Sequence, residues 1–412
     1  MRNIYLLKDI LFRRKALLFI SIALLFFVNI LLFTVIRSIY SVSENMLSLR
    51  QFSKQTVYVG NDQSTAEEND SLFSENTLNN SNELAHDVVD YLQTNYSYAI
   101  NWVIDSPYLK QDENNITFRS IDQSSLTMFS MDIMDGQSFT SKDFLESTTN
   151  IPVLVGSALS GNYPVGTVFH TINPTNEKEE SYEVIGVLQD NSFVSSLYAI
   201  DSKDYLNYSV IRPITDADKK TINITELVLG LQDLLVFGED KKGVQNLSSY
   251  LKKELNYTVK FYPQTENFED FFSQYKAGVA ILIGIGIIFL GGTITLIVWN
   301  VYISYQLMIR EITIRMMVGL SPKTFQRALL ISQFCLGMVS IIPVYFYALS
   351  MRVVINKSIM TSFKTMTYLG LATMDSVSIL ILTGIIISTM MISAWAINRK
   401  VSKIPISLRV LE

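Results

Sequence analysis

Four long stretches of the sequence carry no charged side chain, and they constrain the fold more than any other feature. They span residues 16–36, 277–309, 328–351 and 376–398. Each has at least the ~20 residues that a helix needs to cross ~30 Å of hydrocarbon. The composition agrees, since 49% of the residues are hydrophobic and only 17% are charged. The chain is therefore predicted to be an α-helical membrane protein with four transmembrane helices.

The first apolar stretch follows Arg13, Arg14 and Lys15, as the apolar region of a secretory signal follows its basic start. The stretch is longer than the apolar region of a signal peptide, and no small-x-small cleavage pattern follows Ile36. We therefore expect it to remain in the membrane as the first span.

Charge is divided unevenly along the chain. Residues 38–275 contain 15 basic and 34 acidic side chains, whereas the remainder contains 18 basic and 4 acidic ones. Basic residues gather in the N-terminus, after the second span and in the C-terminus, and basic loops face the cytoplasm. Both termini are therefore predicted to be cytoplasmic, and segment 38–275 extracytoplasmic.

The single cysteine, Cys335, excludes a disulfide framework and a cysteine-ligated zinc site. The predicted extracytoplasmic segment has no cysteine, which fits the surface of a bacterial cell. The expected location is the bacterial cytoplasmic membrane, crossed several times.

The predicted organisation has nine parts. A large extracytoplasmic α/β domain is inserted between transmembrane helices 1 and 2, so that one helix precedes the domain and three follow it (1 + 3). The nine parts are a cytoplasmic amphipathic N-terminus (1–15), the first span (16–37), the extracytoplasmic domain with helical stalk segments at both ends (38–275), the second span (276–303), a cytoplasmic coupling helix region (304–325), the third span (326–350), a short extracytoplasmic loop (351–375), the fourth span (376–397) and a basic cytoplasmic tail (398–412).

Periodicity within segment 38–275 predicts a mixed α/β domain. Apolar residues at helical spacing predict helices over 83–94 and 244–255. Runs rich in β-branched and aromatic residues predict strands over 56–59, 115–119, 152–155, 182–188, 226–230 and 257–262. The polar stretch 61–82 is interpreted as a loop. Segments 38–55 and 266–276 lack Pro and Gly, so they are expected to continue the first and second membrane helices.

Motifs that carry catalysis are missing from the sequence. It has no P-loop, no H-E-x-x-H and no G-x-S-x-G pattern, and it contains two histidines. The four apolar stretches contain no ionisable residue, which argues against an ion-coupled transporter. The chain is predicted to be a non-catalytic subunit that binds no cofactor itself. If ATP is used, a partner protein must bind it.

An amphipathic helix is predicted directly after the second span. Glu311 and Arg315 are four residues apart and can pair on one helical face, and Gly319 followed by Pro322 would end the helix. Such a helix can dock in the groove of a partner protein or lie among lipid headgroups, and the pattern alone leaves both open. Ala280 and Gly284 in the second span form a small-x-x-x-small pattern, which occurs at helix interfaces but also elsewhere in membrane helices.

The chain resembles the FtsX-like or MacB-type permeases of ABC transporters. The signature after the second span of that family is matched by Arg310, Glu311, Ile312, Ile314, Arg315 and Gly319, and the sequence departs from it at Thr313, Met317 and Leu320. Residues 131–139, 152–156, 165–166 and 182–187 resemble the extracytoplasmic core pattern of the MacB type, with Gln137 in place of an arginine. The tail 398–409 resembles the basic ending of the family.

The resemblance implies a permease subunit of a type VII, or mechanotransmission, ABC transporter. Its implied partners are a dimer of cytoplasmic ABC ATPases that hold ATP and Mg²⁺, a second permease copy or homologue, and membrane lipid, but no nucleic acid. Arg310, Glu311, Ile312, Ile314, Arg315 and Gly319 would couple to the ATPase, and Gly136, Gly166 and Gly186 would be structural turns of the outer domain. Export or extraction of a peptide, antimicrobial or lipid-linked substrate is expected.

A second hypothesis is a membrane-anchored surface sensor or adhesin that has no ATPase partner. A neighbouring gene for a P-loop ATPase without membrane spans would favour the permease. The sequence leaves open the substrate and whether the permease is a homodimer or a heterodimer.

Overall fold

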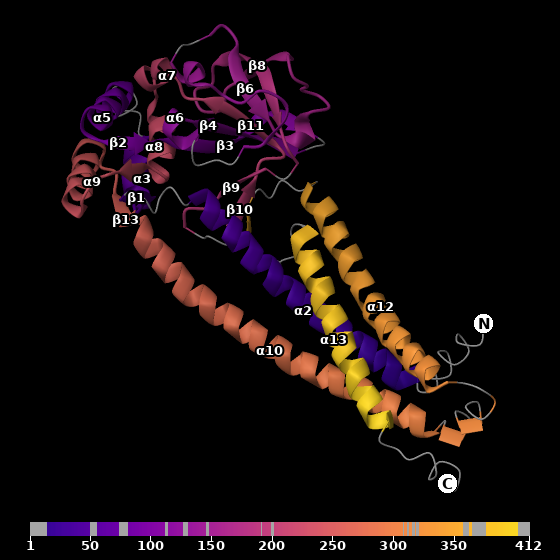
Figure 1. Cartoon of the computed structure of the whole chain (residues 1–412). Helices are drawn as coiled ribbons and strands as arrows, with labels where there is room; N and C mark the ends of the chain where they lie inside the picture. The colour runs from indigo at the N-terminus through magenta and orange to yellow at the C-terminus, as the bar shows by residue number, and fades with distance from the viewer. Residues whose placement is uncertain are drawn as a thin grey trace. The chain divides into compact units, whose positions relative to one another are not determined.

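The structure is a computed structural model that divides into two compact units (Figure 1). It describes residues 15–49, 56–73, 81–111, 114–126, 131–145, 148–190, 192–198, 202–307, 309–310, 313–314, 318, 321–356, 362–364 and 376–402. The helical unit comprises Met1–Ser41, Tyr275–Val354 and Thr365–Glu412, and the α/β unit comprises Val42–Gln274 and Ile355–Lys364.

Four long helices pass through the helical unit: α2 (Lys15–Ser48), α10 (Gln264–Leu307), α12 (Pro322–Asn356) and α13 (Ser376–Ser402). All four are long and apolar enough to cross a membrane, over Leu18–Leu47, Gln264–Ile303, Ile331–Ser350 and Val377–Arg399. Four candidate membrane helices with a large α/β region between the first and the second agree with the predicted fold class. Helices α2 and α10 also continue without a break into the α/β unit.

The helices pack through an apolar core that includes Leu25 and Phe33 of α2, Leu336 of α12 and Ile386 of α13. Gly337 permits close approach, because a Cβ atom there would lie 2.9 Å from Met390 Cγ of α13. A buried polar contact accompanies this core, in which the Asn29 amide of α2 donates to the Ser340 hydroxyl of α12 at 2.9 Å. An amide that pairs within the bundle avoids the cost of an unsatisfied polar group in hydrocarbon.

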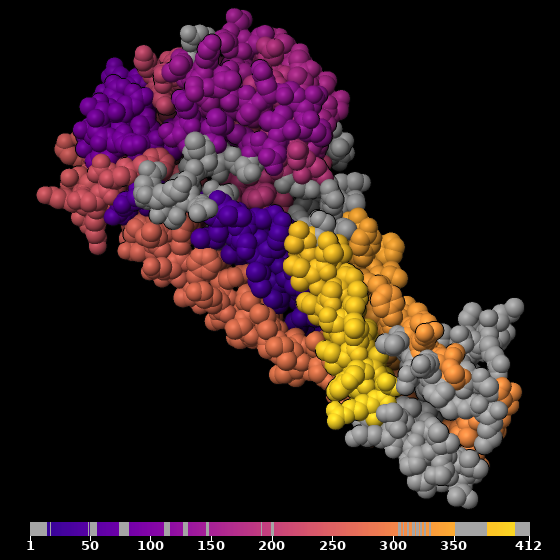
Figure 2. All heavy atoms as spheres, viewed as in Figure 1, coloured from indigo at the N-terminus to yellow at the C-terminus, as the bar shows by residue number. Residues whose placement is uncertain are grey.

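Helix α10 is packed less than the other three. About a fifth (22%) of its most apolar stretch is buried, against 39% for each of the others, and its side chains line much of the face seen in Figure 2. Phe27 of α2 meets Phe289 of α10 edge-on with ring centroids 5.3 Å apart, and the Ser38 and Tyr275 hydroxyls lie 3.1 Å apart. Lipid or another protein must cover the remaining apolar surface of α10.

The first sheet of the α/β unit has four antiparallel strands in the order β13-β1-β12-β2. They are β13 (Val259–Pro263), β1 (Val57–Asp62), β12 (Leu235–Phe237) and β2 (Ser97–Ala99). Helices α5 (Ser81–Asn95), α8 (Ile224–Gln232) and α9 (Lys241–Leu255) pack against this sheet and share one apolar core with it.

The second sheet follows the order β3-β4-β11-β6-β8-β5, and β7 also pairs with β8. Its strands are β3 (Asn101–Gln111), β4 (Asn114–Ile121), β5 (Ile133–Gly136), β6 (Ile151–Val155), β7 (Val168–Ile172), β8 (Glu179–Leu188) and β11 (Ser209–Pro213). The pairs β4–β11 and β6–β8 are parallel, and the others are antiparallel.

Both faces of the second sheet are apolar. Val153 and Val155 of β6 belong to one core cluster, whereas Leu154 between them belongs to another. Successive side chains of a strand point to opposite faces, so the two clusters cover the two sides of the sheet. A sheet that is buried on both sides is held firmly, which gives the unit a rigid centre.

A third, small sheet has the order β14-β10-β9, from β14 (Ser362–Lys364), β10 (Ser202–Tyr205) and β9 (Phe193–Ser195). The remaining elements are short: α3 (Ala66–Leu72), α6 (Gln123–Leu126), α7 (Asp216–Lys220) and two 3₁₀ helices, η2 (Ser141–Phe144) and η3 (Ser157–Leu159).

Two predictions of local structure were wrong. The run 226–230 is not a strand but lies inside α8, because the Asn223 side chain accepts the Glu226 N–H at 2.9 Å and the Glu226 carboxylate accepts the Asn223 N–H at 3.2 Å. This reciprocal capping starts a helix. Within stretch 61–82, predicted as a loop, β1 reaches Asp62, α3 forms after a Thr65–Glu68 capping box, and α5 begins at Ser81; residues 74–80 lie outside the described ranges.

Two predicted helices and five predicted strands agree with the structure, whereas the predicted helical continuation over 38–55 is seen only to Ser48, and residues 50–55 lie outside the described ranges. Helices α5 and α9 cover the predicted helical runs 83–94 and 244–255. Strands β1, β4, β6, β8 and β13 overlap the predicted strands at 56–59, 115–119, 152–155, 182–188 and 257–262.

Candidate coupling site

The predicted ATPase-coupling residues are described only in part. Arg310 and Ile314 have exposed side chains, and Glu311, Ile312, Arg315 and Gly319 lie outside the described residues. The Val318 N–H donates to the Ile314 carbonyl at 3.0 Å, which is the i to i−4 bond of a helical turn. The functional assignment of these six residues stays a prediction.

Pro322 follows this turn as the first residue of α12. The Ser321 side chain accepts the Thr324 N–H at 3.2 Å, as an N-cap residue does. Proline is favoured at the first helical position because its missing N–H would have no helical partner there. The start of the membrane-length helix α12 is therefore fixed at Pro322.

The end of α2 is fixed inside the α/β unit by Asn45, which is fully buried. Its amide donates to the Ser202 carbonyl of β10 at 3.2 Å, and its side-chain oxygen accepts the Ser195 hydroxyl of β9 at 3.2 Å. One side chain thus binds both strands of the β9–β10 hairpin, defined here as residues 193–198 and 202–205.

A second contact joins the same two elements one residue earlier in α2. The Lys203 ammonium of β10 forms an ion pair with the Glu44 carboxylate. The lysine side chain is 2% exposed, and its ammonium lies 3.9 Å from the centroid of the Phe193 ring. A lysine is rarely this buried without a charged partner, so Glu44 and Lys203 hold α2 and the hairpin together.

The start of α10 binds the same hairpin. The Gln264 side chain is 1% exposed and donates to the Leu197 carbonyl at 2.8 Å. Strand β14, which lies between α12 and α13 in the sequence, pairs with β10 in antiparallel register, Lys203 opposite Phe363. Segments from three places in the chain therefore meet at the β9–β10 hairpin.

A cavity of about 190 Å³ lies beside the hairpin. Its lining includes Leu49 directly after α2, Leu197 of the hairpin, and the charged side chains of Arg119, Asp204 and Asp233. The Arg119 guanidinium is nearly buried and lies 3.8 Å from the Asp204 carboxylate.

Burial changes the acid–base behaviour of this cavity. It lowers the pKa of the Arg119 guanidinium, and the carboxylates of Asp204, Asp105 and Asp233 oppose that change. Burial also raises the pKa of the Asp233 carboxyl, which contacts with Tyr198 and Arg119 offset only in part. The charges are therefore held where desolvation disfavours them.

The three glycines predicted as turns lie along strand β8 and its neighbours. Gly136 has φ +81°, and a Cβ atom there would lie 2.3 Å from the Ile185 carbonyl oxygen. Gly166 has φ +85° with open space around it. At Gly186 a Cβ atom would lie 2.5 Å from the Gln137 carbonyl oxygen. Gly136 and Gly186 therefore allow β5 and β8 to approach closely.

Sequence reasoning did not single out Glu44, Asn45, Lys203 or Gln264. Among the described residues, no three His, Cys, Asp or Glu side chains come close enough to hold a metal ion. The contacts found at the hairpin are polar and structural, and they suit the transfer of a displacement between helices.

Two solved structures are similar to part of this chain. The extracellular domain of the noncanonic ABC-type transporter YknZ from Gram-positive bacteria has 14% sequence identity, with a TM-score of 0.29, over 50% of this chain and 98% of that one. The periplasmic region of MacB from Actinobacillus actinomycetemcomitans has 14% identity, with a TM-score of 0.31, over 55% of this chain and 97% of that one.

No family model matches the chain, and no curated protein matches it.

Proposed function

We propose that this chain is the permease subunit of a type VII ABC transporter and that it transmits ATP-driven movement from the cytoplasm to the α/β unit. One observation carries the proposal. Helices α2 and α10 each run without a break from a membrane-length apolar segment into the α/β unit, and both bind the β9–β10 hairpin there.

The lengths of α2 and α10 support a role in transmitting movement along the helix axis. Helix α2 has 34 residues and α10 has 44. At 1.5 Å per residue they measure about 51 Å and about 66 Å, well beyond the ~30 Å of hydrocarbon. Because each helix is continuous, a shift of its cytoplasmic half reaches its other end.

The polar contacts at the hairpin support the transmission of movement from α2 and α10 to the hairpin. Asn45, Lys203 and Gln264 are nearly buried, and each side chain bonds to a partner on the opposite element. Buried hydrogen bonds and ion pairs cost more to break than exposed ones. Movement of α2 or α10 would therefore move the hairpin with it.

The apolar spans support a mechanism that needs no polar channel. The four uncharged stretches of the sequence contain no group that could bind and release an ion. We infer that substrate is handled by the α/β unit or at its junction with the membrane. Export or extraction of a peptide, antimicrobial or lipid-linked molecule fits this mode of action.

We assign ATPase docking to the segment after α10, with Arg310, Glu311, Ile312, Ile314, Arg315 and Gly319. The basic residues on this side of the spans support a cytoplasmic location for this segment by the positive-inside rule. A separate ATPase dimer holds ATP and Mg²⁺, and a second permease copy or homologue completes the complex. The exposed apolar surface of α10 is available for that second permease.

Copurification tests this proposal. The tagged full-length chain, solubilised from its native membrane in mild detergent, should bring down a P-loop ATPase that lacks membrane spans. Glu311→Lys should insert normally and lose that ATPase, whereas Lys142→Glu, a charge reversal in the α/β unit, should keep it. If wild type and Glu311→Lys retain equal amounts of ATPase, the docking assignment is wrong.

A further inference from the structure

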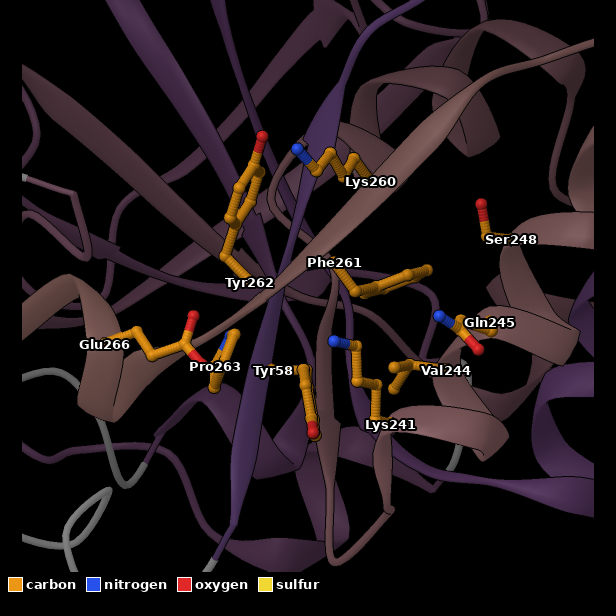
Figure 3. A pocket seen from close by; sticks show the side chains of 10 residues that line it. All are labelled: Tyr58, Lys241, Val244, Gln245, Ser248, Lys260, Phe261, Tyr262, Pro263 and Glu266. Carbon is orange, nitrogen blue, oxygen red and sulfur yellow. The ribbon is translucent and has the colours of Figure 1, made fainter.

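A cavity of about 340 Å³ lies in the α/β unit between helix α9 and strand β13 (Figure 3). Its walls come from the first half of α9, from the four consecutive residues 260–263, from Tyr58 of β1 and from Glu266 in the first turn of α10. This volume is within the range of ligand sites in proteins.

The cavity opens along the edge of the sheet and not over one face. Lys260 and Tyr262 point to one face of β13, and Phe261 points to the other, toward α9 (Figure 3). Since successive side chains alternate between faces, a cavity lined by all of them must border the edge of the strand. Strand β13 is the terminal strand of its sheet among the described strands, with β1 as its neighbour.

The hydrogen-bond pattern shows which backbone groups reach that edge. The Gln63 N–H donates to the Thr258 carbonyl at 2.8 Å, so this is a hydrogen-bonded pair of the antiparallel ladder. In an antiparallel ladder, pairs of residues joined by backbone hydrogen bonds alternate with pairs that are not. Asn61 and Lys260 therefore form a hydrogen-bonded pair, whereas Gly60 and Phe261 lie opposite each other without backbone hydrogen bonds between them.

The other bonds of Gly60 agree with this assignment. Its N–H donates to the Leu234 carbonyl at 2.8 Å, and its carbonyl accepts the Tyr198 hydroxyl at 2.7 Å. The N–H and C=O of Phe261 therefore face the free edge. The Val259 carbonyl at the same edge accepts the Ser248 hydroxyl of α9 at 2.5 Å, which leaves Phe261 to pair with an added strand.

Charge at the cavity differs from that of the surrounding segment. Residues 38–275 carry 34 acidic and 15 basic side chains, yet Lys241 and Lys260 both line this cavity, against one carboxylate, Glu266. Among the described residues neither lysine forms an ion pair, and Lys260 lies 4.7 Å from the Tyr262 ring centroid. Two ammonium groups against one carboxylate leave a net positive charge at the cavity, which attracts an anionic ligand.

We propose that an extended peptide carrying a carboxylate side chain binds in this cavity by adding a strand to the free edge of β13. One peptide residue exchanges two backbone hydrogen bonds with Phe261, and the carboxylate is bound by Lys241 and Lys260. Strand addition gives affinity through the main chain, and the two lysines give selectivity for acidic peptides.

This site adjoins the helix to which the coupling role is assigned. Strand β13 ends at Pro263, and α10 begins at Gln264. A peptide on β13 thus binds the residues that lead into α10. The inference goes beyond the proposed function, since the binding it describes does not depend on an ATPase.

Fluorescence anisotropy with the full-length protein in nanodiscs tests the site. The probe is a labelled, end-capped heptapeptide of alternating threonine and valine with glutamate at the centre. We expect saturable binding, and replacement of the glutamate by glutamine should weaken it about two- to fivefold, the range for one exposed ion pair. Lys241→Gln and Lys260→Gln should each weaken the acidic peptide similarly.

Lys242→Gln is the matched control, because Lys242 is exposed beside Lys241 and does not line the cavity. It should bind the acidic peptide as wild type does. A series of peptides, each with one methylated backbone nitrogen, tests strand addition. Methylation should abolish binding at alternate positions, where the N–H points toward β13, and should not do so at the positions between, where the N–H points away.

Three results would overturn the proposal. They are the absence of saturable binding, equal binding of the glutamate and glutamine peptides, and equal loss at every N-methylated position. Competition by inorganic phosphate at the same concentration as unlabelled peptide would also overturn it, because the site would then bind anions without a strand. Melting temperatures of the variants equal to that of wild type would show that each variant is folded.

Discussion

Lys203 and Glu44 join strand β10 to helix α2 through an ion pair whose two ends differ in exposure. The lysine side chain is 2% exposed and the glutamate side chain 33%. Water can therefore solvate the glutamate but hardly the lysine. Removing either partner should have unequal consequences, which makes the pair a direct probe of how α2 is held.

Glu44→Gln should destabilise the protein more than Lys203→Met. The first change takes the carboxylate from a nearly buried ammonium, at a cost of about 2–3 kcal/mol, whereas the second leaves a partly hydrated carboxylate, at about 1 kcal/mol. Thermal unfolding of the full-length protein in detergent measures both, and the double variant should recover part of the Glu44→Gln loss. The reverse order of melting temperatures would contradict the burial argument.

Asn45→Leu and Gln264→Leu should separate ATP hydrolysis from movement of the α/β unit. Each removes the side chain that binds α2 or α10 to the hairpin, and each lost hydrogen bond costs about 0.5–1.5 kcal/mol. Both variants should still copurify with the ATPase, because the changes are far in sequence from the segment 304–325. Transport by reconstituted complexes should fall while ATPase activity persists.

Matched surface variants provide the control for that prediction. Asn95→Leu replaces an exposed amide at the end of α5, outside the hairpin, and should leave transport unchanged. Wild-type transport by both Asn45→Leu and Gln264→Leu would show that the hairpin contacts do not transmit movement.

Asp233→Asn should stabilise the protein at neutral pH. Burial raises the pKa of the Asp233 carboxyl in the folded state, so the folded protein binds this proton more tightly than the unfolded chain does. The stability linked to this proton is present at low pH and is lost as pH rises through the raised pKa. The variant should therefore be more stable than wild type at pH 7, and this gain should shrink as the pH falls toward 4.

Unfolding of wild type and variant between pH 4 and pH 8 measures this difference. Asp87→Asn, at an exposed residue on α5, is the control for replacing a carboxylate by an amide outside the cavity. A gap between wild type and Asp233→Asn that does not change with pH would refute the assignment.

Gly136→Ala should cost more than Gly166→Ala, although both glycines have positive φ. The left-handed backbone alone costs an alanine about 1–2 kcal/mol at each position. At Gly136 the new Cβ atom would also meet the Ile185 carbonyl oxygen at 2.3 Å, whereas at Gly166 nothing lies within 4 Å. Equal melting temperatures for the two variants would show that β5 moves freely away from β8.

The membrane helices and most of the regular structure follow from sequence because their signals are local. Length and apolarity mark the four long helices, and runs of β-branched and aromatic residues mark strands such as β6 and β8. Helix α8 was mistaken for a strand because its short apolar run favours both structures, and the capping pair Asn223 and Glu226 decides between them.

The contacts at the β9–β10 hairpin could not be predicted in the same way. Strands β9 and β10 have three and four residues, and Ser195, Ser202 and Lys203 look like surface residues in sequence. Their burial depends on Glu44 and Asn45, which are about 150 residues earlier in the chain. Only the tertiary structure brings these residues together, so no local pattern contains the information.

Hydrogen–deuterium exchange at the β9–β10 hairpin tests transmission most directly. The complex of this chain with its ATPase is compared with and without ATP and Mg²⁺, using peptides that cover 193–198 and 202–205. ATP should change exchange at these amides in wild type but not in Asn45→Leu combined with Gln264→Leu. An ATP-bound wild-type complex whose hairpin exchanges as it does without nucleotide would contradict the account.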